Sequence, residues 1–122
     1  MKLWIDVEHR ISKPELRRIY RSLLPRIRRV ARKAGYAIAV HGSETRDFDL
    51  FAIPWVIEAV PDAVLAERIN KVVAKYWKSA ETFKSESTLK PHGRRAYTIY
   101  LGCYGKFKKK AIFIDLSVMP TL

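Results

Sequence analysis

The sequence predicts one α/β domain, of the α+β kind, in which a mixed or antiparallel sheet of about four strands carries helices mainly on one face. Three observations support this prediction. The chain has 122 residues, enough for one hydrophobic core and too few for two. Two stretches have the spacing of amphipathic helices, and the other apolar stretches are short, as in strands. Because neither an internal repeat nor a linker interrupts this pattern, residues 1–122 are expected to form a single domain.

The first predicted element is a long helix over residues 12–34. Ser12 can cap its N-terminus, Pro14 suits its first turn, and Gly35 can end it in the left-handed conformation. Pro25 lies inside the pattern and predicts a kink or a break into two abutting helices. The apolar positions that recur at helical spacing are Leu16, Ile19, Tyr20, Leu23, Leu24, Ile27, Val30, Ala31 and Ala34.

Two strands in a hairpin are predicted next. Residues 36–42, YAIAVHG, are short, apolar and flanked by glycine, which indicates a buried strand. Residues 47–53, DFDLFAI, follow closely enough in sequence to pair with them. Pro54 is expected to close the second strand, because proline has no N–H to donate to a ladder.

A second helix and two more strands complete the predicted fold. Pro61 and Asp62 open the helix. Its apolar stripe comprises Leu65, Ile69, Val72, Val73 and Tyr76. Residues 78–94 are polar and form the longest expected loop, while residues 95–101 and 110–118 alternate as two strands do.

The strongly basic composition points to polyanionic partners. The chain has 24 Lys and Arg against 12 Asp and Glu, a net charge of +12, which favours nucleic acid, nucleotides or an acidic membrane. Basic residues cover the polar side of the first helix: Arg17, Arg18, Arg21, Arg26, Arg28, Arg29, Arg32 and Lys33. The candidates for contacts to a phosphate backbone are Arg17, Arg21, Arg28 and Arg32. A solvated helix face accounts for these residues equally well.

A second basic group lies in the turn before the strand at residues 95–101. It comprises Lys90, His92, Arg94 and Arg95. These side chains can meet the phosphates of a nucleotide or of an acceptor strand. An ordinary solvent-exposed loop is the equally weighted alternative.

Cysteine use and hydropathy indicate a cytoplasmic protein. Cys103 has no intramolecular partner, which favours a reducing compartment. The first ten residues carry charges that a signal peptide's apolar core does not tolerate. Since no apolar run approaches the roughly 20 residues that span a bilayer, no membrane association is expected.

Three aspartates are the candidate catalytic and metal-binding residues. Asp47 and Asp49 point to the same side if their segment is a strand. Asp115 lies in the apolar segment AIFIDLSV, where an unpaired charge is costly, so a shared cation would stabilise it. Three carboxylates on adjacent strands suit Mg²⁺ or Mn²⁺, and such sites serve phosphoryl transfer. The alternative is a hairpin turn in which the aspartates accept hydrogen bonds from backbone amides.

Gly42 and Ser43 precede the aspartates. A glycine at a strand end lets the backbone approach a phosphate, and the serine hydroxyl can hold phosphate oxygens. A plain turn favours the same two residue types, so this pair alone does not distinguish the alternatives.

The order of strand, Gly-Ser, Asp-x-Asp-Leu, helix and a later strand with a third Asp resembles the DNA-polymerase-β-like nucleotidyltransferase superfamily. The segments HGSETRDFDLFAIPW, KPHGRRAYTIYLG and IDLSVMP resemble, more narrowly, small phage-encoded nucleotidyltransferase-like proteins. The resemblance covers about residues 14–118 and rests on three short motifs. It implies a minimal nucleotidyltransferase-like domain in which Asp47, Asp49 and Asp115 bind metal and Gly42 and Ser43 hold the triphosphate.

The chain departs from the superfamily pattern at one point. Only Glu44, Thr45 and Arg46 separate Gly-Ser from the first Asp, where the superfamily has a longer segment, often a helical turn. This shortening removes most of the helix N-terminus that would bind the triphosphate. Arg46 either compensates as a nucleotide-binding residue or pairs with an aspartate in place of the metal.

The expected function is transfer of a nucleoside monophosphate from an NTP to a nucleic-acid or protein acceptor, with Mg²⁺ or Mn²⁺. The alternative is a catalytically inactive protein of phage origin, in the host cytoplasm, that binds nucleic acid or a host nucleoprotein through basic surfaces. A metal-dependent nuclease ranks lower, because no lysine has the spacing that this chemistry uses.

Two aromatic residues near the motif have both structural and functional interpretations. Trp55 is expected in a core or an interface, with base stacking as the alternative. His41 is expected to be a buried or hydrogen-bonded strand residue, with a general base as the alternative.

Overall fold

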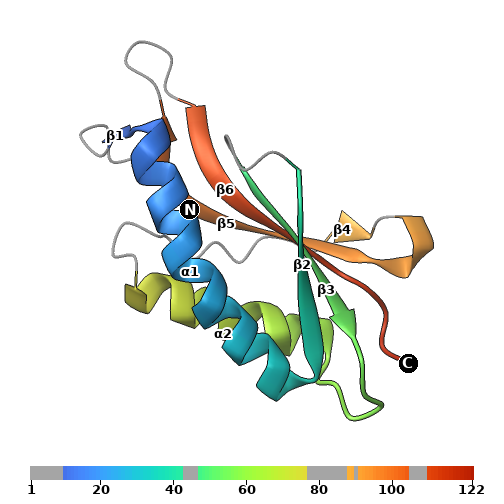
Figure 1. The fold of residues 1–122 in the computed structure, drawn as a ribbon. Coiled ribbons are helices and arrows are strands. Elements are labelled where there is room, and N and C mark those ends of the chain that lie inside the picture. The colour runs from blue at the N-terminus through green and yellow to red at the C-terminus, as the bar shows by residue number, and fades with distance from the viewer. Residues whose placement is uncertain (1–9, 43–46, 77–87, 90, 105–109) are drawn as a thin grey trace.

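The computed structural model describes residues 10–42, 47–76, 88–89, 91–104 and 110–122. Two helices lie against one face of a twisted mixed sheet (Figure 1). The elements in chain order are β1 (Arg10–Ile11), α1 (Lys13–Ala34), β2 (Tyr36–His41), β3 (Phe48–Pro54), α2 (Asp62–Tyr76), β4 (Thr88–Leu89), the 3₁₀ turn η1 (Pro91–Gly93), β5 (Arg95–Tyr104) and β6 (Lys110–Val118).

Helix α1 begins and ends at the predicted residues. The Ser12 side chain accepts a hydrogen bond from the Glu15 N–H at 3.3 Å, and Gly35 ends the helix with φ of 93°. The helix continues through Pro25 as one element, so of the two predicted alternatives the break into two helices is wrong, and the kink stays a prediction. Since Pro25 is exposed, its ring lies on the solvent side, away from the core.

The sheet order is β1-β5-β6-β3-β2, with β4 also paired to β5. Strands β2 and β3 form the predicted antiparallel hairpin, and β3 ends at Pro54 as expected. Strand β6 lies parallel to β3 and antiparallel to β5. Four long strands in a mixed sheet, with helices on one face, confirm the predicted fold class.

Two very short strands were not predicted. Strand β1 pairs with the end of β5 and β4 pairs with its beginning. Both lie on the edge of β5 that faces away from β6, and β4 falls in the segment that the sequence assigned to a loop. Each contains two residues, too few for a hydrophobic pattern to mark them.

The hydrophobic core fills the space between the helices and one face of the sheet. Phe48 of β3 stacks on Tyr20 of α1, with ring centroids 4.2 Å apart. Strand β6 contributes Ile112, Ile114, Leu116 and Val118 to the core, as the alternation predicted. Because strand side chains alternate, the remaining residues of β3 and β6 lie on the opposite face, which no helix among the described residues covers.

Neither of the two described helices is both long enough and apolar enough to cross a bilayer.

Candidate functional site

A row of polar side chains crosses four strands on the face of the sheet away from the helices. Asp49 of β3 pairs with His41 on one side and with Asp115 on the other, and Asp115 pairs with Thr98. The neighbouring register pair, Leu50 and Leu116, points into the core. We call the face that carries Asp49 and Asp115 the open face of the sheet.

Two of the three predicted carboxylates are neighbours in this row. Asp49 and Asp115 are direct partners on parallel strands, which lie about 4.8 Å apart in sheets, and both are half-buried. Like charges opposite one another on neighbouring strands repel. A cation that binds both carboxylates would remove this repulsion.

The end of β2 lies against the Asp49 carboxylate. Gly42 has φ of 82°, a conformation that side chains other than glycine rarely adopt. A Cβ atom at Gly42 would lie 2.9 Å from Asp49 Oδ2, closer than carbon and oxygen tolerate. The backbone conformation therefore favours glycine, and any larger residue would also push the Asp49 carboxylate from this position.

Asp47 makes a different contact from its neighbour. It precedes β3, which begins at Phe48 rather than at the predicted position 47. The Phe113 N–H donates to Asp47 Oδ1 at 3.2 Å, which fixes the start of β3 to β6. Such a bond to a backbone amide is what the structural alternative predicted for these aspartates, although the amide comes from a distant strand.

These contacts define what metal the site can hold. Among the described residues, no group of three or more His, Cys, Asp or Glu side chains is close enough to bind one ion. Mg²⁺ in nucleotide-dependent sites commonly uses one or two carboxylates, and phosphates and water complete the shell. Asp49 and Asp115 suit this second arrangement, whereas Asp47, whose carboxylate accepts from the Phe113 N–H, does not form one ligand group with them.

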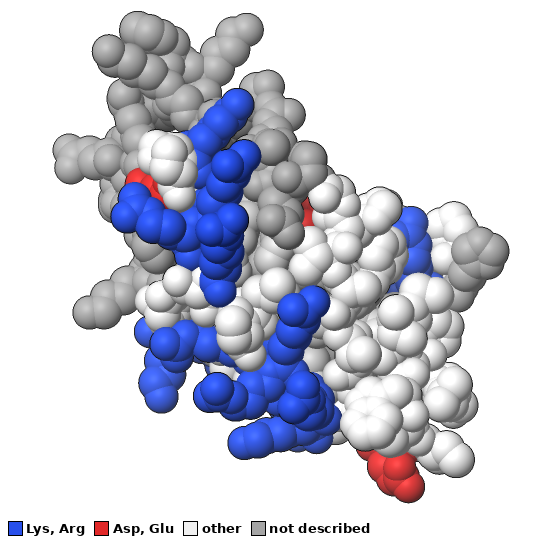
Figure 2. All heavy atoms as spheres, in the orientation of Figure 1, with Lys and Arg blue, Asp and Glu red and all other residues white. Residues whose placement is uncertain are grey.

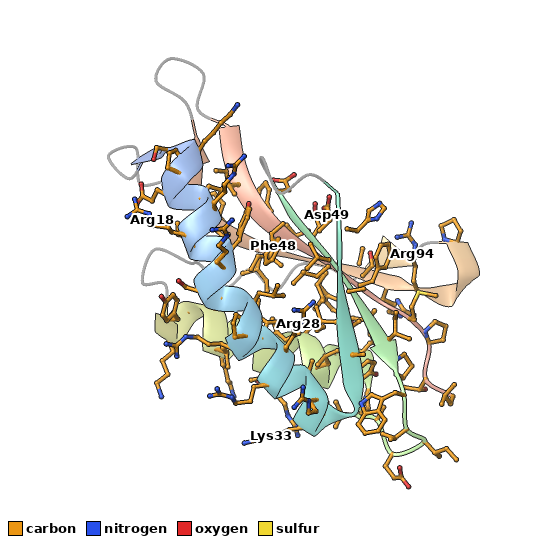
Figure 3. All side chains as sticks on the ribbon, in the orientation of Figure 1. Arg18, Arg28, Lys33, Phe48, Asp49 and Arg94 are labelled. Carbon is orange, nitrogen blue, oxygen red and sulfur yellow. The ribbon has the colours of Figure 1, made fainter. Side chains whose placement is uncertain are left out.

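Arg94 extends over the open face (Figure 3). Its Nη1 donates to Ser117 Oγ at 3.2 Å, and its guanidinium lies 5.7 Å from the Phe51 ring centroid. Phe51 and Ser117 are register partners two residues along from the aspartate pair. A positive charge therefore lies on the same face as Asp49 and Asp115, one row away.

The predicted basic turn is divided by the sheet. Arg95 is next to Arg94 in β5 but has Val118 as its register partner and lines a hollow with Asp62 on the helix side. Gly93 turns the chain before them with φ of 74°. Arg94 alone of this pair reaches the open face.

Some predicted residues fall outside the described part of the chain. They are Ser43, Arg46 and Lys90, and the side chain of His92 is not described either. The choice between a nucleotide-binding and a charge-pairing Arg46 therefore stays a prediction.

The four predicted phosphate-contacting arginines of α1 form one stripe. Arg17, Arg21, Arg28 and Arg32 are all exposed. At about 100° per residue they fall within an arc of about 60°, and at about 1.5 Å per residue they span about 22 Å. Figure 2 shows that Lys and Arg side chains gather along this helix, whereas the neighbouring surface is mostly free of charge. We call these four residues the arginine stripe.

The structure corrects part of what was expected of two aromatic residues. Trp55 is 58% exposed, so it is not a core residue, and the interface and base-stacking interpretations stay predictions. His41 is an exposed strand residue rather than a buried one. The His41 and Phe51 rings lie edge to face on the open face, with their centroids 5.4 Å apart. Trp55 directly follows Pro54 at the end of β3, a position from which a side chain can leave the sheet.

The sequence also missed a polar cluster under α2. The buried Tyr36 phenol donates to the Val60 carbonyl at 2.5 Å, and the Tyr97 hydroxyl donates to Asp62. Burial, and then the charge of Asp62, raises the pKa of Tyr36 above its ordinary value. These contacts attach the start of α2 to the sheet, on the opposite face from Asp49.

No family model matches the sequence, and no curated protein matches it. The resemblance to nucleotidyltransferases accordingly rests on the three motifs and stays a prediction.

Proposed function

We propose that the protein is a metal-dependent nucleotidyltransferase that moves a nucleoside monophosphate from an NTP to a nucleic-acid acceptor. The observation that carries the proposal is the register of β3 and β6, which makes Asp49 and Asp115 direct partners on the open face. Two carboxylates side by side suit a hard divalent cation, and no described helix covers the face on which they lie.

In this proposal Asp49 and Asp115 hold Mg²⁺ or Mn²⁺, and Asp47, through its hydrogen bond with the Phe113 N–H, positions the start of β3 next to them. The bound ion would neutralise charge on the reacting phosphates. Gly42 admits the triphosphate because it has no side chain and its left-handed backbone turns at the Asp49 carboxylate. The triphosphate would then lie between the end of β2 and the aspartate pair.

Arg94 has the charge and position to orient the nucleotide. Its guanidinium already approaches Phe51 and Ser117, so it needs only a small movement to meet a phosphate near Asp49. The Phe51 ring, with His41 on its edge, offers an apolar surface for the base or sugar. This arrangement would place the phosphates toward Gly42 and the base toward Phe51.

The test measures nucleotide binding and transfer together. Purified protein is incubated with labelled NTP, Mg²⁺ or Mn²⁺, and RNA, DNA and protein acceptors. We expect labelled acceptor from the wild type and a loss of at least about a hundredfold for Asp49→Asn and Asp115→Asn, because each removes a charged ligand. The matched control is Glu67→Gln, an exposed acid on α2 that pairs only with Lys71 among the described residues.

The result that overturns the proposal is absence of both transfer and metal-dependent nucleotide binding by the wild type. A labelled acceptor that is shortened rather than extended would assign the same acids to a nuclease.

The exposed arginine stripe supports a second candidate, a non-catalytic protein that binds nucleic acid or a host nucleoprotein through its basic surface. In that case Asp49→Asn and Asp115→Asn leave binding unchanged, while Arg→Glu changes in the stripe weaken it. Binding measured with these variants in the absence of NTP separates the two candidates.

A further inference from the structure

A hollow lies where the last turns of α1 face the first residues of β2. Its volume is about 320 Å³, and Arg28, Arg32, Tyr36, Ile38 and Trp55 contribute to its lining. This volume falls at the lower end of the range for small-ligand sites, roughly 300 to 1,000 Å³. The hollow lies at the edge of β2, its lining contains neither aspartate of the pair, and no step of the proposed transfer uses it.

The hollow combines an aromatic ring with two cations. Trp55 is 58% exposed, and Arg28 and Arg32 are exposed next to it. An exposed indole stacks on any nucleobase, and guanidinium groups bind phosphates. Nucleic acid provides both partners on one chain, so this lining is complementary to it in charge and in shape.

Arg28 is held at this place by the edge of the sheet. Strand β2 is the last strand in the sheet order, so one of its edges has no neighbouring strand among the described residues. Arg28 Nη2 donates to the Ile38 carbonyl on β2 at 3.4 Å, and Figure 3 shows the side chain directed from α1 toward that strand, whereas Lys33 points away. Arg28 therefore borders the hollow rather than moving freely in solvent.

The arginine stripe continues from the hollow along α1. The turn at Gly35 reverses the chain, so α1 and β2 run in opposite directions (Figure 1). The stripe, followed from Arg32 back to Arg17, therefore runs in the same direction as β2, toward Gly42 at the far end of that strand. A strand that starts in the hollow and follows the stripe would head toward the end of the sheet that carries the proposed site.

We propose that this hollow is a binding site for single-stranded nucleic acid, in which Trp55 stacks on one unpaired base and Arg28 and Arg32 bind the adjoining phosphates. Arg21 and Arg17 bind the phosphates that follow. A duplex has no unpaired base to stack on Trp55, so it would contact only the arginine stripe. That the bound strand is the acceptor of the transfer reaction rests on the proposed function, whereas the binding itself does not.

The experiment measures binding of fluorescently labelled single-stranded RNA and DNA, and of the matching duplexes, by anisotropy in EDTA without NTP. Trp55→Ala is expected to weaken single-strand binding about 5- to 100-fold, which is the usual range for one base stacked on an aromatic ring. Duplex binding should not change. Trp55→Phe, which keeps an aromatic ring, should retain most of the affinity, and Trp55→Leu should not. The matched control is Ile57→Ala, because Ile57 is 78% exposed and outside the hollow.

The arginine arm uses two double variants of equal charge change. Arg28→Ala with Arg32→Ala should weaken binding and lower the slope of log affinity against log salt by about 1.4, since each phosphate contact on a single strand contributes about 0.7. Arg29→Ala with Lys33→Ala removes the same charge from exposed positions outside the hollow and should have a smaller effect.

Equal affinity of wild type, Trp55→Ala and Trp55→Leu for single strands overturns the proposal, as does an equal effect of the two double variants. If Trp55→Ala does not fold, the single-strand affinities of Trp55→Phe and Trp55→Leu still test the stacking, and equal affinities of these two variants would overturn the proposal. Because EDTA removes the metal, this binding assay does not depend on the proposed function. Single-strand binding by a protein that shows neither transfer nor nucleotide binding when Mg²⁺ is supplied would overturn the proposed function and leave this site intact.

Discussion

The open face of the sheet and the arginine stripe of α1 carry opposite charges and are built in different ways. Asp49 and Asp115 are half-buried and are placed by strand register, so their separation is set by the hydrogen bonds of the sheet. The stripe is placed by helical spacing, and its side chains are exposed, with Arg28 also bonded to the Ile38 carbonyl. The first region suits a site that requires fixed geometry, and the second suits a partner that binds by charge.

The largest expected difference between the two regions is in how the affinity for their ligands depends on salt concentration. Four phosphate contacts to the stripe predict that single-strand affinity falls about 50-fold when salt rises from about 50 to about 200 mM. Binding of metal and nucleotide to the half-buried aspartate pair is screened less and should fall by a smaller factor. Anisotropy titrations and calorimetry at the same salt concentrations measure both. Equal salt dependence would show that the two ligands use the same surface.

Gly42→Ala should affect the aspartate region alone. The change places a Cβ 2.9 Å from Asp49 Oδ2 at a φ of 82°, and we expect it to lower the free energy of unfolding by about 1 to 3 kcal/mol. Because the same clash displaces Asp49, metal-dependent nucleotide binding should weaken by at least about tenfold. Thermal unfolding and calorimetry measure the two effects.

Gly93→Ala is the matched control for this prediction. Gly93 also has a left-handed backbone, with φ of 74°, and its added Cβ would lie 3.1 Å from Pro120 Cγ rather than near an aspartate. We expect a loss of stability without a change in nucleotide binding. If both glycine variants lose nucleotide binding equally, the role of Gly42 is only structural.

Sequence patterns predicted the features that depend on local order. The Ser12 cap, the alternation in β6 and the hairpin of β2 and β3 each follow from residues close in sequence, and all three are present. The placement of Asp49 and Asp115 on the same face follows from the two-residue period of strands.

Features that depend on the order of strands in the sheet were not predictable in this way. The bond from the Phe113 N–H to Asp47 requires β6 to lie parallel to β3, and the hollow at Trp55 requires β2 to be the edge strand. The spacing of apolar residues along the sequence specifies neither which strands are neighbours nor which strand lies at the edge of the sheet. Trp55 shows the consequence, because its apolar ring predicted burial and its place beyond the end of an edge hairpin leaves it exposed.

Tyr36→Phe is expected to have the smallest effect, a small loss of stability that leaves the aspartate pair unchanged. Its phenol is 1% exposed and donates to the Val60 carbonyl, so Tyr36→Phe removes one hydrogen bond and leaves that carbonyl without this donor. We expect a loss of about 1 kcal/mol in the free energy of unfolding near neutral pH. Metal-dependent nucleotide binding and transfer should not change, since the hydroxyl lies with Val60 and Asp62, on the opposite face of the sheet from Asp49.

The pH dependence of stability in the wild type and in Tyr36→Phe tests whether burial opposes ionisation of the Tyr36 phenol. Burial and the charge of Asp62 raise the pKa of Tyr36 in the folded protein above its ordinary value of about 10. As pH rises through about 10, the unfolded chain releases the phenol proton while the folded protein retains it, so this residue's contribution to stability is present below that pH and lost above it. The wild type should therefore lose stability relative to Tyr36→Phe between about pH 9 and pH 11. Chemical denaturation of both proteins across this range measures the difference, and a constant difference would mean that burial does not oppose ionisation of Tyr36.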